Sequence, residues 1–156
     1  MNFSIVPLYN GNKAKIYTIQ VEGAELSEYK QFVFENMSLR KEAVRVLNTT
    51  LQNMAYKRGF IDEFFIRESP QDFNVFKVTE TDDLRLYCIR YSGIAIIVGG
   101  GGIKLPNKFK LKENPHLQKK VDFLIEIEKK IQERLASKEI KITDNGFEGD
   151  LNFKEL

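Results

Sequence analysis

The stretch LRLYCIRYSGIAIIVGGGGIK, residues 84–104, decides what kind of sheet this chain builds. Residues 84–91 are typical of a strand, Ser92-Gly93 is typical of a tight turn, and residues 94–98 (IAIIV) are typical of a second strand. Because residues 94–98 are apolar on both faces, we expect that strand to lie in the centre of a sheet. The stretch therefore predicts a β-hairpin whose second strand is buried on both sides.

Four consecutive glycines, Gly99 to Gly102, follow that apolar strand. A phosphate-binding loop of the P-loop type needs a lysine directly after glycine and then a Ser or Thr hydroxyl for magnesium. Here Ile103 separates the glycines from Lys104, Leu105 follows the lysine, and no helix is expected to begin at the glycines. This spacing disfavours a nucleotide-binding enzyme. We expect the glycines to form a β-bulge or a tight bend with close backbone approach.

Hydrophobic periodicity predicts the other elements. The expected strands cover residues 2–9, 15–21, 73–79, 84–91, 94–98 and 140–143, and residues 61–67 are either a short strand or a packed extension. The expected helices cover residues 25–36, residues 39–57 and a long segment opened by Asn114-Pro115, an N-cap followed by proline. We therefore predict an α+β fold. It has a mainly antiparallel, twisted sheet with an N-terminal helical hairpin and a long C-terminal helix packed on it.

Length and composition are those of one globular domain spanning residues 1–156. The net charge of +2 gives no global reason to bind nucleic acid, so an anionic partner would have to meet a local cluster of cations. The single cysteine, Cys88, excludes an intramolecular disulfide, and with the single histidine, His116, it is too little for a Cys/His zinc site. No apolar run approaches the roughly 20 residues of a membrane span. We expect a cytoplasmic protein without a metal ion, a cofactor or a membrane contact.

Basic and aromatic side chains gather around the predicted hairpin. Alternation along residues 84–91 places Arg85, Tyr87 and Tyr91 on one face and a mostly apolar set on the other. Lys77 on the preceding strand is expected as a cross-strand neighbour. Cations that meet phosphates and rings that stack on bases are typical of single-stranded RNA binding. The predicted RNA-binding residues are Tyr87, Tyr91, Lys108 and Lys110. The alternative is a solvated basic face covered by tyrosines.

The whole pattern resembles the core of the RelE/ParE superfamily, the toxins of type II toxin–antitoxin systems, and HigB-like members most of all. The features that carry the resemblance are Lys77, Arg85, the turn Ser92-Gly93, the apolar strand 94–98, the glycines, Lys104 and the helix opened by Asn114-Pro115. The resemblance implies a RelE-like core over residues 15–135, with residues 1–14 and 136–156 as peripheral extensions.

In function, the resemblance implies a toxin-like endoribonuclease that cuts mRNA at the ribosome without a metal ion and that a cognate antitoxin neutralises. Its catalytic residues would be Lys77, Arg85 and Lys104. Arg85 would clamp the scissile phosphate, and a lysine would act as acid or charge stabiliser. The chain departs from many family nucleases because no tyrosine follows Tyr91 and because His116 opens the last helix. The alternative function is a non-enzymatic interaction module on the same scaffold that binds a protein partner.

Overall fold

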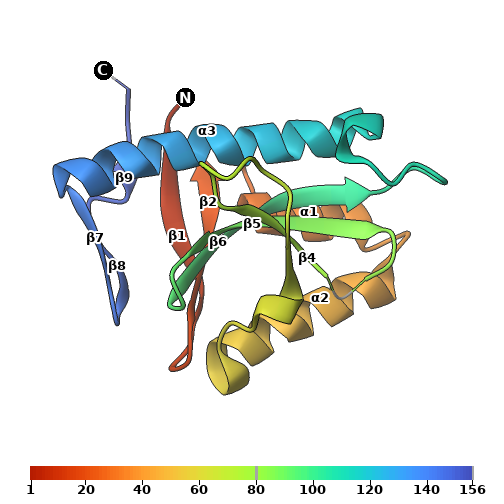
Figure 1. Ribbon diagram of the computed structural model, residues 1–156, viewed down its shortest axis with the longest axis horizontal. Coiled ribbons are helices and arrows are strands. Elements are labelled where there is room, and N and C mark those ends of the chain that lie inside the picture. The colour runs from red at the N-terminus through yellow and green to blue at the C-terminus, as the bar shows by residue number, and fades with distance from the viewer. Residues whose placement is uncertain (80, 156) are drawn as a thin grey trace.

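A seven-stranded sheet forms the middle of the computed structural model, which describes residues 1–79 and 81–155 (Figure 1). Its strands lie in the order β3-β4-β5-β6-β2-β1-β9. Their bounds are β1 Phe3–Asn10, β2 Lys15–Val21, β3 Phe65–Arg67, β4 Val75–Val78, β5 Leu84–Tyr91, β6 Ala95–Ile103 and β9 Asn152–Phe153. A separate hairpin consists of β7 Ile140–Thr143 and β8 Gly146–Gly149.

Helices cover both faces of the sheet. The α-helices in the described part of the chain are α1 Glu28–Asn36, α2 Lys41–Asn53 and α3 Pro115–Ser137. Shorter turns are the π-type η1 Met54–Arg58 and the 3-10 turns η2 Asp62–Phe64 and η3 Leu111–Glu113. None of the helices in these ranges is long and apolar enough to cross a membrane. α3 lies on one face of the sheet and α1 and α2 lie on the other, so the α+β class is confirmed (Figure 1).

Each face of the sheet has its own hydrophobic cluster. The cluster beneath α3 includes Ile19, Tyr87, Ile89, Ile97, Leu124 and Ile131. The cluster beneath α1 and α2 includes Phe32, Leu47, Leu51, Leu86, Cys88 and Val98. β6 lies in the middle of the sheet, as the sequence predicted. Residues of its first half are apolar and buried on both sides, because helices cover both faces of the sheet.

The expected mainly antiparallel, RelE-like arrangement is wrong. β2 and β6 pair in parallel from Lys15 opposite Ala95 to Thr18 opposite Val98, so the sheet is mixed. The other neighbouring strands are antiparallel. Turn signals reveal only strands that follow one another directly, whereas a parallel pair is joined by a long crossover that tertiary packing brings together.

The expected N-terminal helical hairpin is also wrong. α1 packs chiefly against β6 and β2 and contacts α2 much less, while α2 runs into η1 and contacts β5 only as much as it contacts α1. Ser27 starts α1 by accepting a hydrogen bond from the Lys30 amide at 3.3 Å. α2 begins after Arg40 without a side-chain cap. An amphipathic stripe tells which side chains are buried but not what they pack against.

The predicted bulge at the glycines is confirmed. The register of β5 and β6 shifts between Leu86, opposite Gly101, and Cys88, opposite Val98. Two glycines therefore face the single residue Tyr87, which is a β-bulge. Backbones are so close here that a Cβ on Gly101 would lie 1.8 Å from the carbonyl oxygen of Arg85. The strand does not end at the glycines but continues to Ile103.

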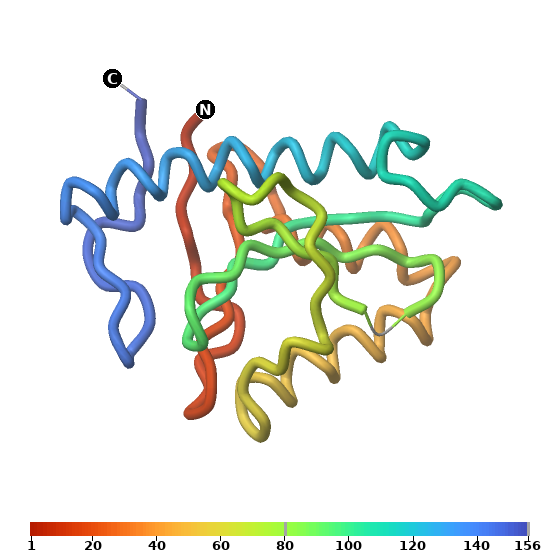
Figure 2. The backbone as a smooth tube through the Cα atoms, viewed as in Figure 1, coloured from red at the N-terminus to blue at the C-terminus, as the bar shows by residue number. Residues whose placement is uncertain are grey.

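Both ends of the chain join the far edge of the sheet and lie near each other (Figure 2). β1 pairs with β2, and β9 pairs with β1. The rings of Phe3 and Phe153 stack with centroids 4.5 Å apart, and the amino group of Met1 forms an ion pair with Glu155. The expected extensions, residues 1–14 and 136–156, thus supply two strands of the main sheet. Leu156 lies outside the described residues.

Candidate nucleic-acid interface

The predicted basic residues Lys77 and Arg85 meet on the face of the sheet that also carries α3. Lys77 lies opposite Tyr87, and Arg85 occupies the diagonal position two residues along β5. Val75 and Tyr87, which share this face with them, belong to the cluster beneath α3. Diagonal neighbours of an antiparallel pair are about 7 Å apart, within reach of long side chains. Both cations are partly exposed, so they share one patch of surface.

Glu68 is the acidic member of this group. It follows β3 directly, and its amide donates to the carbonyl of Val75 at 2.9 Å. Burial raises the pKa of Glu68, and the charges of Lys77 and Arg85 oppose that rise. Burial lowers the pKa of Lys77, Arg85 lowers it further, and Glu68 opposes. These three side chains therefore act on one another, and we call Glu68, Lys77 and Arg85 the charged triad.

Tyr87 and Tyr91, predicted to stack on bases, lie beneath α3. Tyr87 is 1% exposed and Tyr91 is 6% exposed, and the Tyr91 ring packs edge-on against Phe147 with centroids 5.3 Å apart. Base stacking by either ring does not fit this burial. Tyr87 still borders the triad, because it lies opposite Lys77 in the sheet. Burial raises the pKa of its hydroxyl, Glu68 raises that pKa further, and Arg85 opposes the rise. We therefore see Tyr87 as support beneath the triad.

Lys104 opens an exposed basic loop, residues 104–112. Its Nζ donates to the carbonyl of Leu105 at 3.1 Å and lies 4.4 Å from the centroid of the Phe109 ring. Phe109 is 77% exposed and stands between Lys108 and Lys110, which are exposed too. An exposed ring between lysines can stack on a base while the lysines meet phosphates, which is the role that was predicted for Tyr87 and Tyr91.

Asn114 holds the basic loop in shape. Its Oδ1 accepts from the amide of Leu105 at 2.7 Å, and its Nδ2 donates to the carbonyls of Lys108 and Lys110, each at 3.0 Å. Asn114 is 1% exposed. Pro115 begins α3 as predicted, but the Asn114 side chain bonds to the loop instead of capping the helix. The Asn-Pro pair therefore fixes the loop as well as the start of the helix.

Two members of this surface were not predicted. Phe109 had a local signal, since it lies between two lysines in a segment with loop character. Glu68 had none, because it becomes a neighbour of Lys77 only through the pairing of β3 with β4. A sequence pattern identifies such a residue only when the strand register is known.

Other reactive side chains have structural roles. Cys88 is buried, and burial raises the pKa of its thiol to about 12, which makes it unreactive. His116 donates from Nε2 to the carbonyl of Ile103 at 2.6 Å. Within residues 1–79 and 81–155, no group of three or more His, Cys, Asp or Glu side chains is arranged to hold a metal ion.

Comparisons with protein-family models, with curated proteins and with solved structures gave no match to this chain. Its function is therefore inferred from the side chains that the fold brings together.

Proposed function

We propose that this chain binds single-stranded RNA and cleaves it with the charged triad. The observation that carries the proposal is that Lys77, Arg85 and Glu68 share one partly exposed face of the sheet. The basic loop starts two residues after Gly102, the partner of Arg85 in the sheet, so the start of the loop lies near Arg85. Two cations near the start of a loop that carries an exposed ring between lysines suit a single-stranded polyanion whose bases can stack.

The triad offers the groups that RNA transesterification needs. Glu68, as general base, takes the proton of a ribose 2′-hydroxyl, whose oxygen attacks the adjacent phosphorus. Arg85 donates from its planar fork to the non-bridging oxygens as their charge grows. The bond from phosphorus to the 5′ oxygen then breaks, and Lys77, with its lowered pKa, gives that oxygen a proton. The products are a 2′,3′-cyclic phosphate and a 5′-hydroxyl end.

A cleavage assay tests this proposal. End-labelled RNA is incubated with the protein alone and with ribosomes translating a defined mRNA, and the fragments are separated on a denaturing gel. We expect cleavage by the wild type and a loss of about 100-fold or more in rate for Arg85→Gln and for Glu68→Gln. Lys141→Gln, an exposed lysine on β7, is the matched control and should cleave normally. No cleavage by the wild type in either setting, or full activity of both variants, would overturn the proposal.

A protein-interaction module is the second candidate, and an exposed apolar corner where α1 meets α2 favours it. Phe34 is 73% exposed and Leu39 is 70% exposed, with Met37 and Val46 also exposed beside them. A groove of about 330 Å³ runs between β1, α1 and α2 next to this corner. An antitoxin-like partner would dock here, and Phe34→Asp with Leu39→Asp would abolish its binding without changing RNA cleavage. The toxin class, the antitoxin and a cytoplasmic location are proposals that rest on the resemblance.

A further inference from the structure

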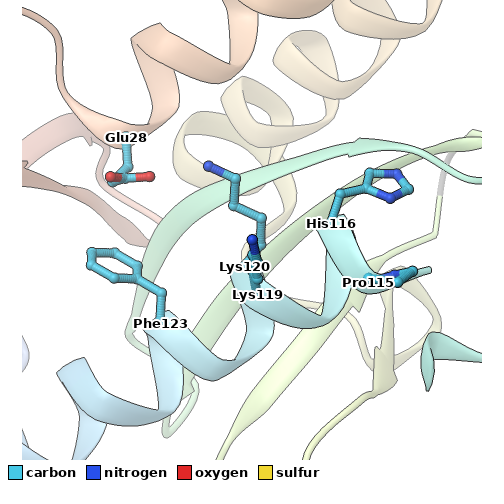
Figure 3. Close-up of a pocket in the computed structure, with 6 residues that line it drawn as sticks. All are labelled: Glu28, Pro115, His116, Lys119, Lys120 and Phe123. Carbon is cyan, nitrogen blue, oxygen red and sulfur yellow. The ribbon is translucent and has the colours of Figure 1, made fainter. Parts of the chain in front are cut away.

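A second group of charged residues surrounds a cavity between the start of α1 and the first half of α3 (Figure 3). The cavity has a volume of about 660 Å³. The residues that line it are Glu28, Pro115, His116, Lys119, Lys120 and Phe123. Helical spacing places four of these residues on one face of α3: His116, Lys119, Lys120 and Phe123. Figure 3 shows Glu28, Lys120 and Phe123 around one shared space.

Gly100 lies beside Glu28 and Lys120, two of the residues that line this cavity. A Cβ on Gly100 would lie 3.4 Å from Oε2 of Glu28, 3.4 Å from Cδ of Lys120 and 3.5 Å from Nζ of Lys120. The glycine therefore marks the point between the carboxylate and the ammonium group. The pairing of β2 with β6 ends at Val98, so β2 does not cover this part of β6.

The charges around the cavity have no partners within the described ranges. There, neither the Glu28 carboxylate nor the ammonium groups of Lys119 and Lys120 form a hydrogen bond or an ion pair within 4 Å. The Glu28 side chain is nevertheless partly buried, and burial raises its pKa, with Lys120 opposing and Glu35 adding to the rise. A half-buried charge is costly unless a partner satisfies it. Such a set of unpaired groups in a cavity is typical of a ligand site.

We propose that this cavity binds a nucleoside phosphate, with a preference for guanine. Lys119 and Lys120 meet the phosphate, and the flat base packs against the Phe123 ring. Glu28 accepts from the base, and guanine presents two adjacent N–H donors that match the two oxygens of a carboxylate. The cavity volume is within the range of about 300–1,000 Å³ that is usual for small-ligand sites. This site is separate from the charged triad and does not depend on the proposed cleavage of RNA.

Calorimetric titration of the full chain with GMP, AMP and inorganic phosphate tests the site. We expect GMP to bind most tightly, and we expect Lys119→Gln with Lys120→Gln to weaken GMP binding by about tenfold or more. Glu28→Gln should remove the preference for GMP over AMP. Gly100→Ala should weaken binding because its methyl group would lie against the Glu28 carboxylate and the Lys120 side chain without touching the backbone.

Two control variants separate loss of the site from loss of the fold. Lys129→Gln changes a lysine further along α3 that is paired with Glu126, and Gly93→Ala adds a methyl group where nothing lies within 4 Å. Both should bind GMP as the wild type does, and thermal melting should show that every variant is folded. The proposal is overturned if the wild type binds none of the three ligands. It is also overturned if the lysine variant binds GMP normally, or if AMP binds as tightly as GMP.

Discussion

Lys77, a member of the charged triad, lowers the stability of the folded chain when it is charged. The pKa of Lys77 is lowered by burial and then by Arg85, which means that its charged form is less favourable in the folded chain than in the unfolded chain. The stability that this shift provides is present only above the unfolded pKa and is lost as the pH falls through the folded pKa. Near neutral pH the charge on Lys77 therefore destabilises the protein, as is common for residues kept for function.

Replacing Lys77 should reveal that cost. We expect Lys77→Met, which keeps an apolar stem of similar length, to raise the melting temperature at neutral pH and to weaken RNA binding by about tenfold. Lys141→Met, on the exposed side of β7, should change neither quantity. Differential scanning calorimetry and RNA titration measure the two effects. A lower melting temperature with normal RNA binding would show that Lys77 is a structural residue only.

Glu68 should make stability depend on pH in the acidic range. Its folded pKa is raised by burial against the opposing charges of Lys77 and Arg85, so its contribution to stability is full at low pH and is lost as the pH rises through that pKa. Glu68→Gln mimics the protonated form. The variant should match the wild type at about pH 4 and become more stable than it towards about pH 7. Melting curves across this range measure the difference, and a difference that is constant with pH contradicts the expected burial of the charge.

Among the elements, the basic loop and β6, the strand that contains the four glycines, are most sensitive to substitution at single positions. Asn114→Ala removes three hydrogen bonds from a buried position and leaves their partners unsatisfied. We expect a loss of about 1–3 kcal/mol in the free energy of unfolding and faster hydrogen exchange over residues 104–112. Asn53→Ala is the control, because that side chain has no hydrogen-bond partner within the described ranges. Unchanged exchange in the loop of the Asn114 variant would mean that something else orders it.

Gly100 and Gly101, adjacent positions of β6, should differ in how much an added methyl group costs in stability. A Cβ on Gly101 would overlap the carbonyl of Arg85 at 1.8 Å, whereas one on Gly100 would meet only side chains at ordinary distance. We expect Gly101→Ala to cost about 2–3 kcal/mol or more of stability and Gly100→Ala to cost little. Chemical denaturation of the two variants measures this difference. Equal stability would contradict the close approach of β5 and β6 at the bulge.

For the whole molecule, sequence patterns predicted local features better than long-range pairing. The apolar run 94–98 predicted a central strand, and the glycines predicted the bulge, because both signals lie within one segment. The parallel pairing of β2 with β6 left no local signal, and neither did the packing of α1 chiefly on β6 and β2. The same limit applied to the site. Lys77 and Arg85 could be paired from neighbouring strands, but Glu68 required the register of β3.

The burial of Tyr87 and Tyr91 has a similar explanation. Alternation in β5 correctly separated the tyrosines from Leu86 and Cys88, but it could not tell that α3 covers the tyrosine face. An amphipathic strand with one apolar face predicts one buried side. The second face is buried because the sheet is covered on both sides, which is a property of the complete fold.

The affinity of the chain for single-stranded RNA tests the central proposal most directly. A labelled RNA of about 10 nucleotides is titrated with the wild type, with Lys77→Gln plus Arg85→Gln, and with the control Lys141→Gln, at salt concentrations between about 50 and 200 mM. We predict binding by the wild type and the control that weakens as salt rises, and at least about tenfold weaker binding with a shallower salt dependence for the double variant. Absence of binding by the wild type, or equal affinity and equal salt dependence of all three proteins, would contradict a role of the charged triad in binding RNA.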